Sequence, residues 1–212
     1  MEEFISNDGV SKMINLLGRF AQSGTDDLGP MATCLRALSC LFVYLSGVNY
    51  LKSRPHLFSK LFDLLPVKGN GTGGMNQYEV KKLVVNIFIG LCKCMKGSFE
   101  CINKAAIITA KRANQSPYAS LLACLSLNDL DLRIGVLTLI NWLLFKCTSN
   151  NKLCKFLARL ENMGVYDDLR ALSKERHPEI LTQLKNFQKN AKIIIPSLQY
   201  EIEIHKNRSK EL

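Results

Sequence analysis

Hydrophobic residues recur along this chain with the spacing of an α-helix, in which every third or fourth residue falls on one face. This period predicts long helices over residues 31–46, 78–96 and 129–147. It also predicts shorter helices over residues 10–20, 57–65, 118–125 and 165–172. No segment shows the sustained alternation of apolar and polar residues that is typical of a half-buried β-strand. The fold class is therefore predicted to be all-α.

The short and long helices alternate, and two stretches of the chain repeat each other directly. Residues 7–17 and 162–172 carry Asn, Gly and Val at corresponding positions, followed by apolar residues at equal distances. The short helices follow one another at intervals a little longer than the ~40–47 residues of armadillo and HEAT units, and the glycine-rich stretch 68–76 is typical of an insertion. We therefore predict an armadillo-repeat-like superhelical solenoid of about four units, whose curvature creates a concave groove.

The chain is predicted to have two parts. Residues 1–176 form the armadillo-like repeat domain. Residues 177–212 form a C-terminal helical extension toward a dimerisation region, in which the residues around Pro196 interrupt the helical stripe and a charged helix follows over 197–208.

The predicted helix 129–147 is apolar on nearly every side, with Asn128 or Asp129 as its N-cap. One stripe suits the core: Leu132, Val136, Ile140 and Leu143. A second flank carries Gly135, Thr138, Leu139, Trp142 and Phe145. Two interpretations fit this flank. It packs between neighbouring helices as the central layer of the solenoid, or it lines a groove that receives an amphipathic helix.

Composition limits the functions that this helical chain can have. Its 212 residues carry a formal net charge of +10, and only 22% of them are charged, so most of the chain is expected to fold. The apolar runs are too short to span a bilayer, and the acidic first residues do not resemble a secretory signal. The charge indicates an acidic partner or a well-solvated basic surface.

Nucleic acid is one acidic partner to consider. Basic residues gather in the middle of the chain: Lys81, Lys82, Lys93, Lys96, Lys104, Lys111 and Arg112. Proteins that bind single strands usually combine such residues with exposed aromatic side chains, on which bases stack. Here the aromatic residues fall mostly on predicted core stripes: Phe42, Phe58, Phe62 and Phe88. A basic nucleic-acid-binding repeat protein stays an alternative, but no nucleic-acid partner is expected.

Eight cysteines could form disulfides or bind zinc. Five of them lie within apolar helical segments, where a thiol packs like a small hydrophobic residue: Cys34, Cys40, Cys92, Cys124 and Cys147. The closest pair, Cys92 and Cys94, diverges on a helix because residues two apart are rotated by about 200°. We expect reduced packing thiols, no bound metal and a cytosolic chain.

Motifs for catalysis or phosphate binding are not found in the sequence. The glycines of the stretch 68–76 are followed by Met75-Asn76 instead of the Lys-Ser/Thr of a phosphate-binding loop. No serine or cysteine has a convincing histidine partner among the three histidines. The chain is expected not to be an enzyme, and no cofactor is expected.

Around the helix 129–147 the sequence resembles a known family. Residues 133–145, together with Phe156-Leu157, residues 163–165 and Leu169, are similar to the armadillo region of diaphanous-related formins. Further landmarks of that region are resembled, in the same order, by residues 4–10, 34–38, 83–92 and 183–187. By this resemblance the chain is identified as a formin GTPase-binding and formin homology 3 region, with its diaphanous inhibitory part.

The resemblance implies a regulatory module. In the family, a GTP-loaded Rho-type GTPase binds the first repeats, and an amphipathic autoregulatory helix from the same protein occupies the groove until the GTPase displaces it. GTPase contacts carried over by position lie near the end of the first long helix and in the next repeat: Tyr44, Asn49, Lys52, Lys93 and Lys96. Positions that face the regulatory helix are Asn86, Gly90, Leu139, Trp142 and Phe145.

The resemblance also implies where the module acts. Actin would be bound through other domains, the only nucleotide and Mg²⁺ would be those of the bound GTPase, and the protein would be cytoplasmic and associated with the cytoskeleton. An acidic membrane surface is a further expected partner, because the basic patches would be attracted to it. A generic armadillo adaptor is the alternative to a formin.

Two features depart from the family pattern. A small residue usually stands where this chain has Trp142. Because an indole would fill part of the groove, weakened or altered autoinhibition is predicted. The paired asparagines of the family's GTPase contact are not found near Val43-Tyr44, so the sequence does not identify the GTPase.

Overall fold

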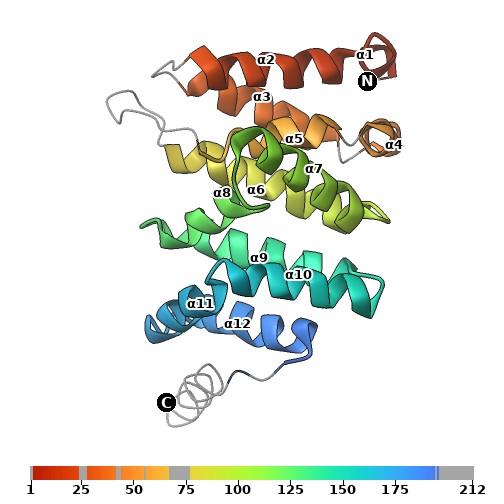
Figure 1. Ribbon diagram of the computed structural model, residues 1–212. Helices are drawn as coiled ribbons and strands as arrows, with labels where there is room; N and C mark the ends of the chain where they lie inside the picture. Colours follow the sequence, from red (N-terminus) through yellow and green to blue (C-terminus); the bar gives the residue numbers. More distant parts are fainter. Residues whose placement is uncertain are drawn as a thin grey trace.

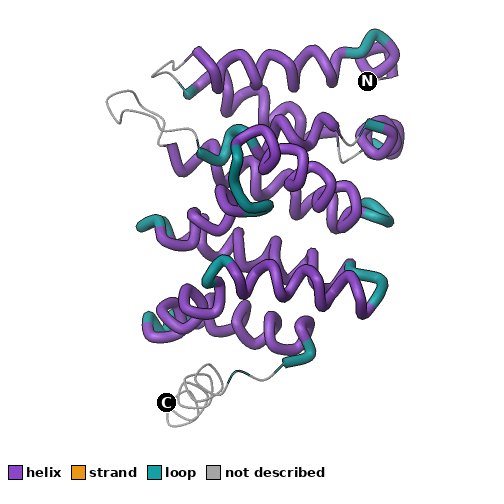
Figure 2. Tube along the Cα trace, viewed as in Figure 1, coloured by secondary structure: helices purple, strands orange, loops and turns teal. Residues whose placement is uncertain are grey.

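The computed structural model describes residues 2–23, 28–41, 44–54, 56–66, 77–193 and 195, and these contain helices and turns without a β-strand (Figure 2). The helices are α1 (Glu2–Ser6), α2 (Gly9–Ser23), α3 (Gly29–Cys40), α4 (Leu45–Ser53), α5 (His56–Phe62), α6 (Gln77–Cys94), α7 (Ser98–Ala113), α8 (Ala119–Leu122), α9 (Leu130–Lys146), α10 (Asn150–Asn162), α11 (Val165–Lys174) and α12 (Pro178–Ala191). None of them has the length and apolar character of a membrane span. The predicted all-α fold is confirmed.

The helices follow one another in groups of three, which are the units of the solenoid (Figure 1). The units are α1–α3, α4–α6, α7–α9 and α10–α12. The third helix of each unit packs against the third helix of the next, so that α3, α6, α9 and α12 form one continuous layer, which we call the ladder. Outside the ladder, α2 packs on α5 and α5 on α7. The predicted armadillo-like repeat architecture is therefore confirmed.

Two of the predicted long helices lie where the hydrophobic period placed them. α6 and α9 agree with the predicted ranges within about two residues at each end. Asp129 is the N-cap of α9, and its carboxylate accepts a hydrogen bond from the backbone N–H of Leu132 at 2.8 Å. This bond satisfies one of the N–H groups that have no partner within the helix.

The third predicted long helix, over 31–46, is divided in the structure. α3 ends at Cys40, and a separate helix, α4, begins at Leu45. Apolar residues continue across this junction, so the helical period does not show the break. The two helices meet very closely at Gly47, where a Cβ atom would lie 2.5 Å from the backbone oxygen of Leu41. Only glycine allows this approach.

The structure also contains helices that the hydrophobic period did not predict, among them α7 and α10. α7 buries several small side chains, including Ala105 and Ala106, which give a weak hydrophobic signal. α10 buries only Leu153, Phe156 and Leu160. Most other residues of α10 are polar and exposed, and a stripe this sparse is hard to recognise in the sequence.

The second helix begins after a sharp turn in three of the four units. Asp8, Tyr118 and Gly164 directly precede α2, α8 and α11, and their φ angles are positive, at 57°, 73° and 76°. The two repeated stretches, residues 7–17 and 162–172, bury the same position, since Val10 and Val165 are both fully buried. They differ in backbone conformation, since the positive φ falls on Asp8 in the first stretch and one position later, on Gly164, in the second.

The helix over residues 178–191, which the sequence assigned to the C-terminal extension, lies in the ladder. α12 packs against α9 and buries Ile180, Leu184 and Phe187. The division of the chain into two domains stays a prediction. The glycine-rich stretch 68–76 and the charged helix expected over 197–208 lie outside the described residues.

All eight cysteines are free thiols. Cys92 and Cys124 are buried, as predicted for packing thiols, and burial raises the pKa of the Cys92 thiol to about 11. Of the other three cysteines predicted to pack in apolar helices, Cys34 and Cys147 are half-buried. The prediction is wrong for Cys40, which is exposed. α3 ends at this residue, and the buried stripe of the helix already ends at Leu38.

Gly9 and Gly18 lie on the same helix but differ in what surrounds them. A Cβ atom on Gly9 would lie 2.6 Å from the backbone oxygen of Phe4, whereas one on Gly18 would have no atom within 4 Å. Gly9→Ala is therefore expected to lower the free energy of unfolding by about 1–3 kcal/mol. Gly18→Ala is expected to raise it by up to about 1 kcal/mol, because alanine favours the helix.

Urea unfolding followed by circular dichroism measures both changes. Equal effects of the two substitutions would contradict the close contact between α1 and α2.

Candidate binding face on the ladder helices

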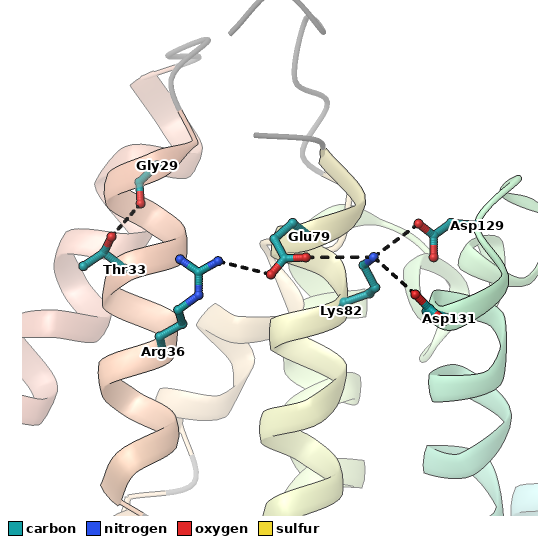
Figure 3. A network of polar contacts seen from close by, with 7 residues as sticks. All are labelled: Gly29, Thr33, Arg36, Glu79, Lys82, Asp129 and Asp131. Carbon is teal, nitrogen blue, oxygen red and sulfur yellow. Dashed lines mark hydrogen bonds and ion pairs between the residues drawn. The ribbon is translucent and has the colours of Figure 1, made fainter. Parts of the chain in front are cut away.

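A row of ion pairs joins the middle of α3 to the N-terminal ends of α6 and α9 (Figure 3). Arg36 of α3 pairs with Glu79 of α6 at 3.2 Å. Lys82 of α6 extends to the start of α9, where it pairs with Asp129 at 3.4 Å and with Asp131 at 3.9 Å. Exposed pairs contribute little stability one by one. Together these contacts connect α3, α6 and α9 at one edge of the ladder.

The two edges of the ladder carry opposite charges. Acidic residues lie in the first turns of ladder helices: Glu79, Asp131 and Glu179. Basic residues lie in their last turns: Lys93, Lys146 and Lys189. Because the ladder helices run in the same direction (Figure 1), the acidic residues share one edge and the basic residues the other. Each charge also stabilises its own helix, since the helix dipole favours acids at the N-terminus and bases at the C-terminus.

A hollow of about 340 Å³ lies between α6 and α9. It begins beside the row of ion pairs, where Lys82 and Asp131 line it, and it includes Asn86. Lys93, Thr138 and Glu179 also line it, together with several apolar residues. Gly135 lets the two helices approach closely, since a Cβ atom there would lie 3.3 Å from a side-chain carbon of Val85. The hollow therefore offers both apolar and charged contacts.

A second hollow, of about 300 Å³, lies between α9 and α12. Trp142 and Phe145 form its aromatic side, with ring centroids 5.8 Å apart in an edge-to-face arrangement. The ammonium group of Lys146 lies 5.6 Å from the centroid of the Trp142 ring, within range of a cation–π interaction. Carboxamides contribute the polar part of the lining: Asn141, Gln183, Asn186 and Asn190.

Asn141 connects α9 with α12 at this second hollow. Its side chain is buried, and Nδ2 donates hydrogen bonds to the backbone oxygen and to Oε1 of Gln183, both at 2.9 Å. The backbone oxygen of Asn141 accepts a hydrogen bond from Nδ2 of Asn190 at 3.3 Å. Because both neighbouring atoms are acceptors, the side-chain atom of Asn141 that faces them must be the nitrogen, Nδ2, and the other must be Oδ1. Oδ1 then has no hydrogen-bond partner among the described residues, and such a buried acceptor costs about 1–3 kcal/mol.

The residues predicted to face a regulatory helix occupy different positions. Asn86 lines the hollow between α6 and α9, whereas Trp142 and Phe145 line the hollow between α9 and α12. Phe145 is 66% exposed, the most of any large hydrophobic side chain among the described residues. Gly90 is half-buried and lines neither hollow.

Leu139 is the one predicted groove residue that is buried in the structure. Its side chain is 0% exposed. Leu139 follows Val136 by three residues and precedes Leu143 by four, so it lies on the same side of α9 as the core stripe. Its assignment to the exposed flank is therefore wrong.

The predicted GTPase contacts are exposed and lie at one edge of the solenoid. Tyr44 is the N-cap residue of α4, and Asn49 and Lys52 lie within α4, which is a separate helix and not the end of a longer one. Lys93 lies in the last turn of α6, and Lys96 lies in the turn that leads to α7. α4 and this turn are on the same side of the molecule (Figure 1).

The carboxamides of α12 were not predicted as site residues. Gln183, Asn186 and Asn190 are three and four residues apart, so their spacing places them on one face of a helix. That signal was present in the sequence. Nothing in the sequence, however, indicates that this face lies opposite Trp142.

Residues 31–167 match the family model described as the FHOD1/3 FH3 domain, and this match covers more than half of the chain. The chain belongs to this family. The resemblance to a formin homology 3 region is thereby confirmed, and the alternative of a generic armadillo adaptor is set aside.

Two curated formins of Dictyostelium discoideum are similar to this FH3 region. It is 26% identical to Formin-C over 191 residues, which cover 90% of the chain, and 26% identical to Formin-G over 212 residues, which cover 99% of it. The FH3 region spans 15% of the length of Formin-C and 18% of the length of Formin-G. It is thus a formin regulatory region that corresponds to a small part of these relatives.

Leu139→Ala and Phe145→Ala are expected to have very different effects on this FH3 region. Removing the buried Leu139 side chain leaves a cavity and is expected to lower the free energy of unfolding by about 2–5 kcal/mol. Phe145→Ala is expected to change it by less than about 1 kcal/mol, because most of the ring is already in water. Chemical denaturation of both variants checks this, and a stable Leu139→Ala variant would contradict the burial of Leu139.

Proposed function

We propose that this FH3 region engages a GTP-loaded Rho-family GTPase and so controls actin filament formation by the formin that carries it. The observation that carries the proposal is the exposed edge formed by α4 and the turn after α6. We call it the α4 edge, and it consists of Tyr44, Asn49, Lys52, Lys93 and Lys96. The only nucleotide and Mg²⁺ would be those of the GTPase, and actin would be bound through other domains of a cytoplasmic, cytoskeleton-associated protein.

Charged groups of α4 and α7 both act on Cys101 of α7. Burial raises the pKa of the Cys101 thiol in α7, and the carboxylate of Glu100 raises it further. The ammonium groups of Lys52 in α4 and of Lys104 in α7 lower the same pKa. Two ammonium groups and one carboxylate thus act on the same thiol, so positive charge is in excess there.

An exposed aromatic residue accompanies these charges. Tyr44 is 46% exposed, and protein interfaces typically combine aromatic anchors at the centre with charged residues at the rim. The net charge of +10 favours association with an acidic protein surface, because opposite charges raise the rate of encounter. These features support a protein partner with exposed carboxylates at the α4 edge.

We extend the proposal to the hollow between α9 and α12. An amphipathic autoregulatory helix of the same formin would place apolar side chains against Phe145 and polar side chains against the carboxamides of α12 that line the hollow. Trp142 occupies part of this face. This supports weaker or altered autoinhibition, because a bulky indole leaves less room for an incoming helix.

Reversing two charges at the α4 edge tests the GTPase proposal. The double variant Lys93→Glu, Lys96→Glu is expected to bind the GTP-loaded GTPase at least about tenfold more weakly, because attraction becomes repulsion. Pull-down titrations with a Rho-family GTPase, loaded with GDP or with a GTP analogue, measure this.

The matched control is the double variant Lys155→Glu, Lys174→Glu, which makes the same change in charge at exposed positions of α10 and α11. Its affinity for the GTP-loaded GTPase is expected to stay within about twofold of the affinity of the unchanged chain. Equal capture of the GDP and GTP forms by the unchanged chain would contradict the proposal.

Trp142→Ala tests the effect of the indole on the groove. This variant is expected to bind the isolated C-terminal regulatory helix of the formin about tenfold more tightly, a gain of about 1.4 kcal/mol, because the space taken by the indole becomes available. Phe145→Ala is expected to weaken binding, since it removes an exposed apolar contact. Fluorescence titration measures both, and sub-micromolar binding by the unchanged chain would refute weakened autoinhibition.

A further inference from the structure

A cleft of about 420 Å³ lies outside the ladder, at the junction of α2, α5 and α7. Its lining residues are Asn15, Gly18, Arg19, Ala21, Lys60, Asp63 and Arg112. Gly18 keeps the cleft open, since a Cβ atom there would meet no atom within 4 Å. None of these residues belongs to the α4 edge or to the ladder helices, so the proposed function does not account for them.

The cleft has an excess of positive charge. Nη2 of Arg112 donates hydrogen bonds to both carboxylate oxygens of Asp63, at 2.9 and 3.1 Å. Lys60 donates a hydrogen bond to Oδ1 of Asn15, and Arg19 is exposed at the mouth of the cleft. Because one carboxylate balances only one of the three cations in the lining, the cleft favours a ligand with at least two negative charges.

The outward face of α2 continues this basic surface. Lys12, Asn15, Leu16 and Arg19 are all exposed, and they are three or four residues apart, so they share one face of the helix. Leu16 is 41% exposed, and it lies between Lys12 and Arg19 in the sequence. An exposed apolar residue flanked by cations is typical of helices that lie on membranes, since the apolar group enters the interface while the cations contact lipid phosphates.

We propose that this cleft binds the phosphate-bearing headgroup of an anionic membrane lipid, with Leu16 inserted into the interface. Arg19, Lys60 and Arg112 would donate charge-assisted hydrogen bonds to the phosphate oxygens. A free phosphate or a soluble acidic peptide would use the cations but would have no need of Leu16. The exposed leucine therefore favours a lipid.

The position of the cleft is compatible with simultaneous binding of a GTPase. α2 and α7 both run from the side of α4 toward the opposite side of the molecule (Figure 1). Arg19 and Arg112 lie in the C-terminal halves of these helices. The cleft and the α4 edge are thus at opposite edges, so a chain bound to a membrane leaves the α4 edge accessible.

Vesicle sedimentation of the 212-residue chain tests the proposal. Vesicles contain phosphatidylcholine alone, phosphatidylcholine with phosphatidylinositol bisphosphate, or phosphatidylcholine with phosphatidylserine at the same total charge. Binding is expected to the anionic vesicles, most strongly to those with the phosphorylated headgroup, and not to phosphatidylcholine alone. Arg19→Glu is expected to weaken this binding at least about tenfold.

Two further variants keep the test specific. Lys155→Glu makes the same change in charge on α10, outside the cleft. Its affinity for anionic vesicles is expected to stay within about twofold of the affinity of the unchanged chain. Gly18→Glu places a carboxylate in open space within the cleft, so it is expected to abolish headgroup binding while circular dichroism shows an intact fold.

The variant Leu16→Ser distinguishes binding of a membrane lipid from binding of a soluble ligand. It is expected to weaken vesicle binding at least about fivefold and to leave the calorimetric affinity for soluble inositol hexakisphosphate unchanged. The proposal is overturned if the unchanged chain does not sediment with anionic vesicles, if Arg19→Glu and Lys155→Glu lose binding equally, or if Leu16→Ser binds vesicles normally. Arg19→Glu should not change the GTPase pull-down, so this proposal and the GTPase proposal can fail independently.

Discussion

The packing of α9 between α6 and α12 is the constraint on which the rest of this structure depends. α9 contacts both ladder neighbours and also α7. Its core stripe is fully buried: Leu132, Val136, Ile140 and Leu143. Burying each such side chain contributes about 1.5–3 kcal/mol. A helix enclosed in this way must be apolar on nearly every side, and its neighbours must approach closely, as Gly135 allows on the side of α6.

The parallel arrangement of the ladder determines where charge and binding groups lie. The N-terminal ends of α6 and α9 meet at one edge, where Glu79 and Lys82 connect them with each other and with Arg36 of α3. All C-terminal ends meet at the other edge, which faces the side of α4. The basic residues there support the proposed contact with an acidic GTPase. Two separate surfaces carry part of the positive charge: the α4 edge and the outer cleft around Arg19.

Much of the fold could be predicted from the sequence, whereas the site could be predicted only in part. The helical period located α6 and α9 because their apolar stripes are continuous, and Asp129 marked the start of α9. The break between α3 and α4 was missed because apolar residues continue across it. Leu139 was misplaced because an all-apolar helix does not show which of its sides is exposed. Phe145 and Trp142 line a hollow that exists only where α9 meets α12, so its position depends on tertiary packing.

The sequence by itself determined that this FH3 region is helical, that it repeats, and that it is a formin region, because periodicity and motif order are properties of the chain alone. Only the tertiary structure decided which apolar residues are buried, that the carboxamides of α12 face Trp142, and that Arg19, Lys60 and Arg112 share one cleft. These residues come from different repeats. Their proximity follows from how the helices stack, and no local pattern in the sequence records that stacking.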